Sequence, residues 1–232
     1  MGSVPINQCE DIPHPGEPPL QFSNAGVPII HVMSQSDYLF GIPVRRDDSD
    51  APTDRYRHYE MAGAAHATPD ELNFSAAPAD ILKAGVAVPS MTCDGHPRSR
   101  FPSRIFFDAM LRNLDLWVRY GIAPPHADVI STQGTPPAGE LDQFGNVVGG
   151  LRSPYLDVPT STWFGSTAGG GFCFIAGHEV PFTAAQLQEL YRSHGAYVRA
   201  VVKDTARLVA GRYITGYDGL DLIREAAQAN VP

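Results

Sequence analysis

A short and almost wholly apolar run near the start of the chain is the feature that most constrains the fold. Residues 27–33 read VPIIHVM, are rich in β-branched side chains, and lie between Gly26 and a polar turn. Apolar side chains at successive positions indicate a strand that is buried on both faces, as in a parallel sheet covered by helices. The run therefore predicts an α/β fold.

A second strand is expected at residues 56–61, which read YRHYEM. Strand-favouring side chains lie beside polar ones there, which indicates a position nearer the edge of the sheet. The charged segment at residues 45–50, RRDDSD, lies between the two expected strands. We expect that segment to be a loop.

An amphipathic helix is expected at residues 104–120. Ser103 is the expected N-cap, Gly121 is the expected stop, and Pro124 with Pro125 prevents the helix from continuing. The apolar side chains at helical spacing form one stripe that would face a core: Phe106, Met110, Leu114 and Trp117.

The second half of the chain is expected to be loop-rich and then helical. Glycine (22 residues) and proline (21 residues) are more frequent than usual, and several glycines interrupt residues 122–180. A capping box at residues 183–186 predicts the start of one helix. Two more are expected around residues 198–209 and 220–223.

The charge of the chain excludes one class of partner. Lysine and arginine number 17 against 25 aspartate and glutamate, for a formal net charge of −8, and there is no basic run. Nucleic-acid binding needs a surplus of positive charge on one face, so we expect no nucleic-acid partner. No stretch approaches the roughly 18 consecutive apolar residues of a membrane span, so none is expected. The first residues, MGSVP, also lack the charged and apolar regions of a signal peptide.

Three cysteines, Cys9, Cys93 and Cys173, show no metal-ligand spacing. One interpretation is that all three are buried or unbonded thiols. The other is a Cys9–Cys93 disulfide, which would leave Cys173 unpaired. Cysteine content alone assigns no cellular compartment.

Two residues suited to acid–base chemistry follow the two expected strands. Asp37 comes after the first strand and His66 after the second. The carboxyl ends of parallel strands meet at one rim of the sheet, so the two side chains could come together there. A carboxylate on a histidine ring N–H fixes the tautomer of the ring and stabilises its protonated form. The alternative is a turn-forming aspartate and a surface histidine.

Several segments together resemble a family of esterase-like α/β-hydrolase-domain proteins. That resemblance implies that Asp37 is the acid of a catalytic triad, that His66 is the general base, and that the substrate is a carboxylic ester. It implies no cofactor. Gln35 departs from the pattern, which would place an acidic residue there. The segments that carry the resemblance are residues 27–40 (VPIIHVMSQSDYLF), 48–50 (DSD), 56–67 (YRHYEMAGAAHA), 101–104 (FPSR), 117–125 (WVRYGIAPP) and 142–159 (DQFGNVVGGLRSPYLDVP).

The serine nucleophile of such a triad is missing from the sequence. α/β-Hydrolases carry it before the acid and histidine, in a Gly-x-Ser-x-Gly elbow, and no such elbow occurs here. In the nearest pattern, Gly165-Ser166-Thr167-Ala168-Gly169, threonine occupies the centre, and the segment around Cys173 lacks the second glycine. Both are expected to be structural turns. We therefore expect an N-terminal half or a partner chain to supply the serine.

The expected fold is thus the C-terminal part of an α/β-hydrolase sheet with a helical, loop-rich extension. Residues 1–121 would form the catalytic part and residues 122–232 the extension.

Other classes of function fit the sequence less well. The histidines lack the close spacing of metal ligands, and His178 with Glu179 forms only a lone pair. Dinucleotide binding at residues 165–171 would need a helix directly after the glycines, and Pro181 delays it. The rival from another class is a binding or regulatory module that keeps part of the hydrolase fold without its chemistry.

Overall fold

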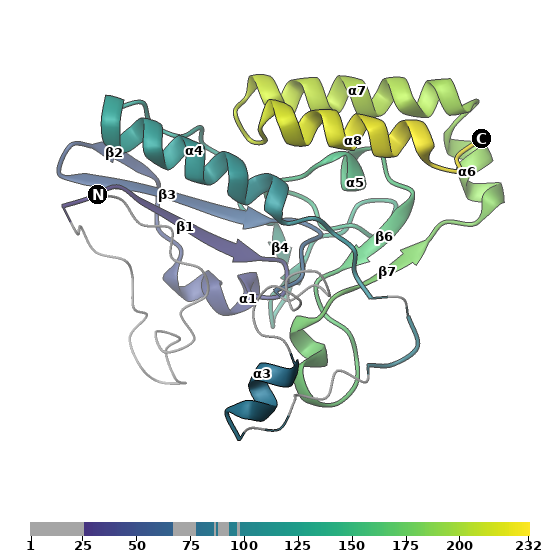
Figure 1. Cartoon of the computed structure of the whole chain (residues 1–232), viewed down its shortest axis with the longest axis horizontal. Helices are drawn as coiled ribbons and strands as arrows, with labels where there is room; N and C mark the ends of the chain where they lie inside the picture. The colour runs from purple at the N-terminus through teal and green to yellow at the C-terminus, as the bar shows by residue number, and fades with distance from the viewer. Residues whose placement is uncertain (1–25, 67–77, 86, 88–92, 97) are drawn as a thin grey trace.

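A computed structural model describes residues 26–66, 78–85, 87, 93–96 and 98–232. It shows small sheets surrounded by helices and long ordered loops (Figure 1). The strands are β1 (Ile29–Ser34), β2 (Ser49–Ala51), β3 (Asp54–Met61), β4 (Thr132–Gln133), β5 (Ala138–Gly139), β6 (Ser161–Phe164) and β7 (His178–Pro181). The α-helices are α1 (Tyr38–Gly41), α3 (Pro78–Lys83), α4 (Arg104–Tyr120), α5 (Pro154–Asp157), α6 (Ala184–Leu190), α7 (His194–Ala210) and α8 (Gly216–Gln228), with 3₁₀ helices η2 (Ile42–Val44) and η3 (Gly171–Ile175).

The largest sheet has the strand order β1-β3-β2. β1 pairs with β3 in parallel, with Ile29 opposite Tyr56 and Ser34 opposite Met61. All six residues of β1 are buried. The parallel pairing predicted from the apolar run is therefore confirmed.

One expectation for this sheet is wrong, and another holds only in part. β3 lies between β1 and β2 rather than at an edge, and residues 56–61 are all buried. The charged segment is a loop at residues 45–48, as expected, but its last two residues begin the edge strand β2, which pairs antiparallel with β3. The polar side chains of β3 can be buried because they find partners there: Arg57 forms ion pairs with Asp48 and Asp50.

Helix α4 has the predicted bounds and covers one face of β1 and β3 (Figure 1). Phe106, Met110 and Trp117 are buried, and Leu114 is half-buried against the same core. From the sheet this core includes Ile30, Val32, Tyr59 and Met61. The predicted apolar stripe is thus confirmed, although Ser103 makes no side-chain capping hydrogen bond.

Trp117→Ala should lower the free energy of unfolding by about 3–5 kcal/mol, the usual cost of deleting a buried indole. Trp117 is 2% exposed, and the guanidinium of Arg57 lies 5.4 Å from its ring centroid. Urea unfolding followed by circular dichroism measures the loss, with the exposed Leu111 of the same helix changed to alanine as the control. A loss in Trp117→Ala no larger than in Leu111→Ala would contradict this packing.

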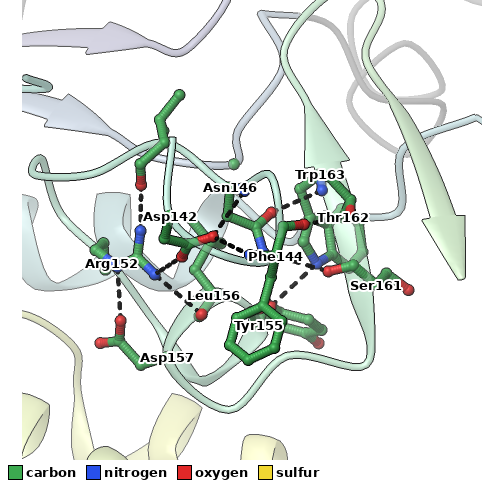
Figure 2. A network of polar contacts seen from close by, with 12 residues as sticks. Asp142, Phe144, Asn146, Arg152, Tyr155, Leu156, Asp157, Ser161, Thr162 and Trp163 are labelled. Atoms are coloured by element: carbon green, nitrogen blue, oxygen red, sulfur yellow. Dashed lines mark hydrogen bonds and ion pairs between the residues drawn. The ribbon is translucent and has the colours of Figure 1, made fainter. Parts of the chain in front are cut away.

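Side-chain hydrogen bonds, rather than long strands, hold together the segment around Arg152, residues 142–163. Its guanidinium donates to Asp157 at 2.6 Å, to Asp142 at 2.9 Å, and to the carbonyl oxygen of Leu156 at 3.0 Å (Figure 2). Asn146 extends this network: its backbone N–H donates to Asp142 at 3.0 Å, and its side-chain oxygen accepts from the backbone N–H of Trp163 at 2.8 Å. Such bonds satisfy backbone groups that no strand or helix pairs. The segment expected to be loop-rich is therefore a folded structure held by polar contacts.

The three C-terminal helices form as expected. The capping box that opens α6 is complete, since Thr183 accepts from the backbone of Gln186 and the Gln186 side chain accepts from the backbone of Thr183. Helices α7 and α8 lie side by side (Figure 1). The division of the chain at residue 121 stays a prediction, and the larger core contains side chains from both sides of it. Among the residues described, no helix has the length and apolarity needed to cross a membrane.

A disulfide joins Cys93 to Cys173, so both interpretations of the cysteines, three unbonded thiols and a Cys9–Cys93 pairing, are wrong. Cys9 lies outside the described residues. The correct pairing follows from a contact between distant segments, since the backbone N–H of Asp94 donates to the carbonyl oxygen of Ala168 at 2.9 Å. That contact brings the two sulfur atoms together across 80 residues of sequence.

Candidate active site

The carboxyl ends of β1 and β3 bring Asp37 and His66 together. The Nδ1 atom of His66 lies 3.2 Å from Oδ2 of Asp37. Asp37 is 6% exposed, and the side chain of His66 is 27% exposed. The carboxylate is therefore shielded while part of the imidazole can meet solvent or a substrate.

The carboxylate of Asp37 is aimed at His66 rather than used in its own turn. Asp37 occupies the N-cap position of α1, yet its side chain makes no capping hydrogen bond. Instead Ser34, at the end of β1, donates its hydroxyl to Oδ2 at 2.6 Å. This arrangement differs from that of a turn-forming aspartate, whose oxygens bind nearby backbone N–H groups.

The turn before His66 depends on Gly63. Its φ of +82° suits glycine, and a Cβ atom there would lie 2.6 Å from Cδ1 of Leu156. The backbone N–H of Gly63 donates to the side-chain oxygen of Gln35 at 2.7 Å. We call the turn at residues 34–37 the acid turn and the turn at residues 62–66 the histidine turn. The neutral amide of Gln35 thus holds the two turns together.

The contact with Asp37 assigns the protonation of the His66 ring. A carboxylate only accepts hydrogen bonds, so the proton of the neutral ring lies on Nδ1. The lone pair then lies on Nε2, which is the atom that can take a proton from a hydroxyl. The pair can therefore act as a general base with its orienting acid.

Comparison with known proteins assigns the family of the chain. A family model described as alpha/beta hydrolase domain matches residues 1–224. The chain belongs to the alpha/beta hydrolase domain family. No curated protein and no solved structure matches the chain.

In this alpha/beta hydrolase domain, Thr167 lies at the centre of the glycine-flanked segment 165–169 and carries its hydroxyl there. Its Oγ1 lies 3.0 Å from Nδ1 of His178, which also lies 2.9 Å from the carbonyl oxygen of Ser166. A carbonyl only accepts, so Nδ1 carries a proton and cannot take one from Thr167. Burial also lowers the pKa of His178.

The alpha/beta hydrolase domain also contains a buried polar network that the sequence analysis missed. It lies on the face of β1 and β3 opposite to α4. Nδ1 of His31 lies 3.0 Å from the Tyr56 hydroxyl and 3.0 Å from Nδ1 of His58. Nε2 of His58 in turn lies 3.0 Å from Glu60, which also binds the guanidinium of Arg45 at 2.6 and 2.7 Å.

The network has a distinct electrostatic character. Burial lowers the pKa of His31 to about 3, and the neighbouring charge of His58 acts in the same direction. Burial alone would raise the pKa of Glu60, but hydrogen bonds from His58 and Arg45 outweigh it and lower that pKa. The sequence signals were a single histidine in β1, His31, and a histidine and a carboxylate at alternate positions of β3, His58 and Glu60. In the part of the chain that the structure describes, there is no group of three or more histidine, cysteine, aspartate or glutamate side chains that could hold a metal ion together.

Proposed function

We propose that this chain supplies the acid and the general base of a serine hydrolase that acts on carboxylic esters. In this proposal Asp37 orients His66, and His66 takes the proton from a serine hydroxyl that attacks the ester carbonyl. Water then hydrolyses the acyl-enzyme. The observation that carries the proposal is the 3.2 Å contact between Oδ2 of Asp37 and Nδ1 of His66.

We further propose that the chain acts as the C-terminal part of the catalytic sheet and that the nucleophile comes from another segment or chain. The sequence contains no Gly-x-Ser-x-Gly elbow. β1 is an edge strand of the described sheet, yet apolar side chains lie on both its faces and all its residues are buried. Such burial is typical of an interior strand, so a further strand that leads to the elbow would fit beside β1.

The isolated chain should resist labelling by a fluorophosphonate, which reacts with activated serines. A histidine–aspartate pair activates a hydroxyl only within hydrogen-bond reach of the imidazole. Esterase activity should therefore be no greater than that of His66→Ala. Mass spectrometry measures the label, and hydrolysis of a p-nitrophenyl ester measures the activity.

The complementary experiment supplies the nucleophile. Extending the chain with the coding sequence upstream of Met1, or adding a partner chain encoded nearby, should restore both activity and labelling. The label should lie on the added part. Labelling of Ser166 or another serine of this chain alone would contradict the proposal, whereas no activity with any added part would favour a binding or regulatory module.

A further inference from the structure

A loop far in sequence from both catalytic residues lies against their turns. We call residues 165–177 the disulfide loop, because the segment carries Cys173 of the disulfide. At Gly165 a Cβ atom would lie 2.7 Å from the carbonyl carbon of Gln35 and 2.7 Å from the amide nitrogen of Ser36. Only glycine permits such an approach, so the loop touches the acid turn directly.

The hydroxyl of Ser36 joins three segments at this contact. Its Oγ donates to the carbonyl oxygen of Gly165 and lies 3.4 Å from the carbonyl oxygen of Ile175. The same oxygen accepts the backbone N–H of His66 at 3.0 Å. Ser36 is buried, so water competes little for these bonds. The single hydroxyl therefore links the disulfide loop to the backbone of the candidate base.

The disulfide loop is itself held in place from outside. The Cys93–Cys173 bond ties its middle to the segment before α4. At its end, the carbonyl oxygen of Gly177 accepts the backbone N–H of Ser99 at 2.9 Å. A third contact, from the backbone N–H of Asp94 to the carbonyl oxygen of Ala168 at 2.9 Å, joins the loop to the same segment. The acceptor that Ser36 uses thus belongs to a loop that is anchored to its neighbour at three points.

We propose that Ser36 is a positioning residue for the Asp37–His66 pair. The disulfide loop orients the Ser36 hydroxyl, and that hydroxyl holds the backbone of His66 so that its ring reaches Asp37. The inference rests on the proposed catalytic role of this pair. The geometry of the ring can nevertheless be measured without any hydrolysis.

The test measures exchange of the His66 Nδ1 proton with water by nuclear magnetic resonance on the full chain with labelled histidine. Ser36→Ala should raise this exchange rate about tenfold, the factor that corresponds to about 1.4 kcal/mol, within the range for one lost hydrogen bond. Ser153→Ala is the matched control, because Ser153 is buried and its hydroxyl has no hydrogen-bond partner. The control should exchange at the parent rate.

A second variant tests the loop. Replacing both Cys93 and Cys173 with serine should also raise the exchange rate, because the loop loses its only covalent bond to the segment before α4. A folded Ser36→Ala that exchanges like Ser153→Ala would overturn the proposal. If Ser36→Ala does not fold, the double cysteine variant tests the proposal instead. An unchanged exchange rate of the His66 Nδ1 proton in that variant would overturn the proposal.

The two proposals fail in different ways. Restored esterase activity in the extended chain with unchanged exchange in Ser36→Ala would remove only the positioning role. Faster exchange in Ser36→Ala without esterase activity in any extended chain would instead overturn the proposed function and leave Ser36 as the residue that positions the histidine.

Discussion

Asp37→Asn should lower kcat of the complemented enzyme about 10⁴-fold, the size of the loss when a triad acid becomes an amide. The amide nitrogen of asparagine can donate to Nδ1 and so hold the lone pair of the ring there, which moves the proton to Nε2. Nε2 could then no longer take a proton from the serine. The 3.2 Å contact between the two side chains makes this change of tautomer possible.

Hydrolysis of a p-nitrophenyl ester by the complemented enzyme provides the measurement. Asp115→Asn is the matched control, because Asp115 lies on α4 with a half-exposed side chain paired to Arg119. That control should keep the parent kcat. Equal rates in Asp37→Asn and Asp115→Asn would show that Asp37 does not orient the base.

The free energy of unfolding should fall as the pH drops below about 6.5, because of His31. In the folded chain the pKa of His31 is about 3, whereas the ordinary value is 6.5. Between these two pH values the unfolded chain binds a proton at His31 and the folded chain does not, so acid favours unfolding. The difference between the two pKa values of His31, at about 1.4 kcal/mol for each pKa unit, corresponds to a loss of about 5 kcal/mol in the free energy of unfolding.

Glu60 should add to this loss at lower pH. Its folded pKa lies below the ordinary value of 4.5, so its stabilising contribution is present above 4.5 and disappears as the pH falls through the folded pKa. Urea unfolding at a series of pH values measures both effects. His31→Gln should lose the part of the pH dependence between 6.5 and about 3, and an unchanged dependence would contradict the role of His31.

Features set by neighbouring residues were predictable from the sequence. Helix α4 begins and ends as its apolar spacing and Gly121 predict, and the capping box at Thr183 opens α6. The contact of Asp37 with His66 was one of two arrangements that the ends of the parallel strands allowed, and the family resemblance selected it.

Features set by distant partners were not predictable. The edge strand β2 lies beside β3, where Asp48 and Asp50 pair with the buried Arg57, whereas a charged run alone indicates a loop. The disulfide depends on the approach of residues 93–94 to residues 168–173, which spacing does not reveal. The hydrogen bonds of the Ser36 hydroxyl likewise depend on the carbonyl oxygen of Gly165, which is far away in sequence.

The histidines of the buried network also decide how β1 and β3 align. β1 is apolar on both faces, so its isoleucines alone would accept a neighbouring register with β3 at little cost. A slip by one residue would turn His31 away from His58 and toward α4, which would bury its ring nitrogen without a partner. Such burial is costly, so the pairing of His31 with His58 selects one alignment. The same alignment fixes where the two strands end, and hence that the acid and the base arrive at the rim together.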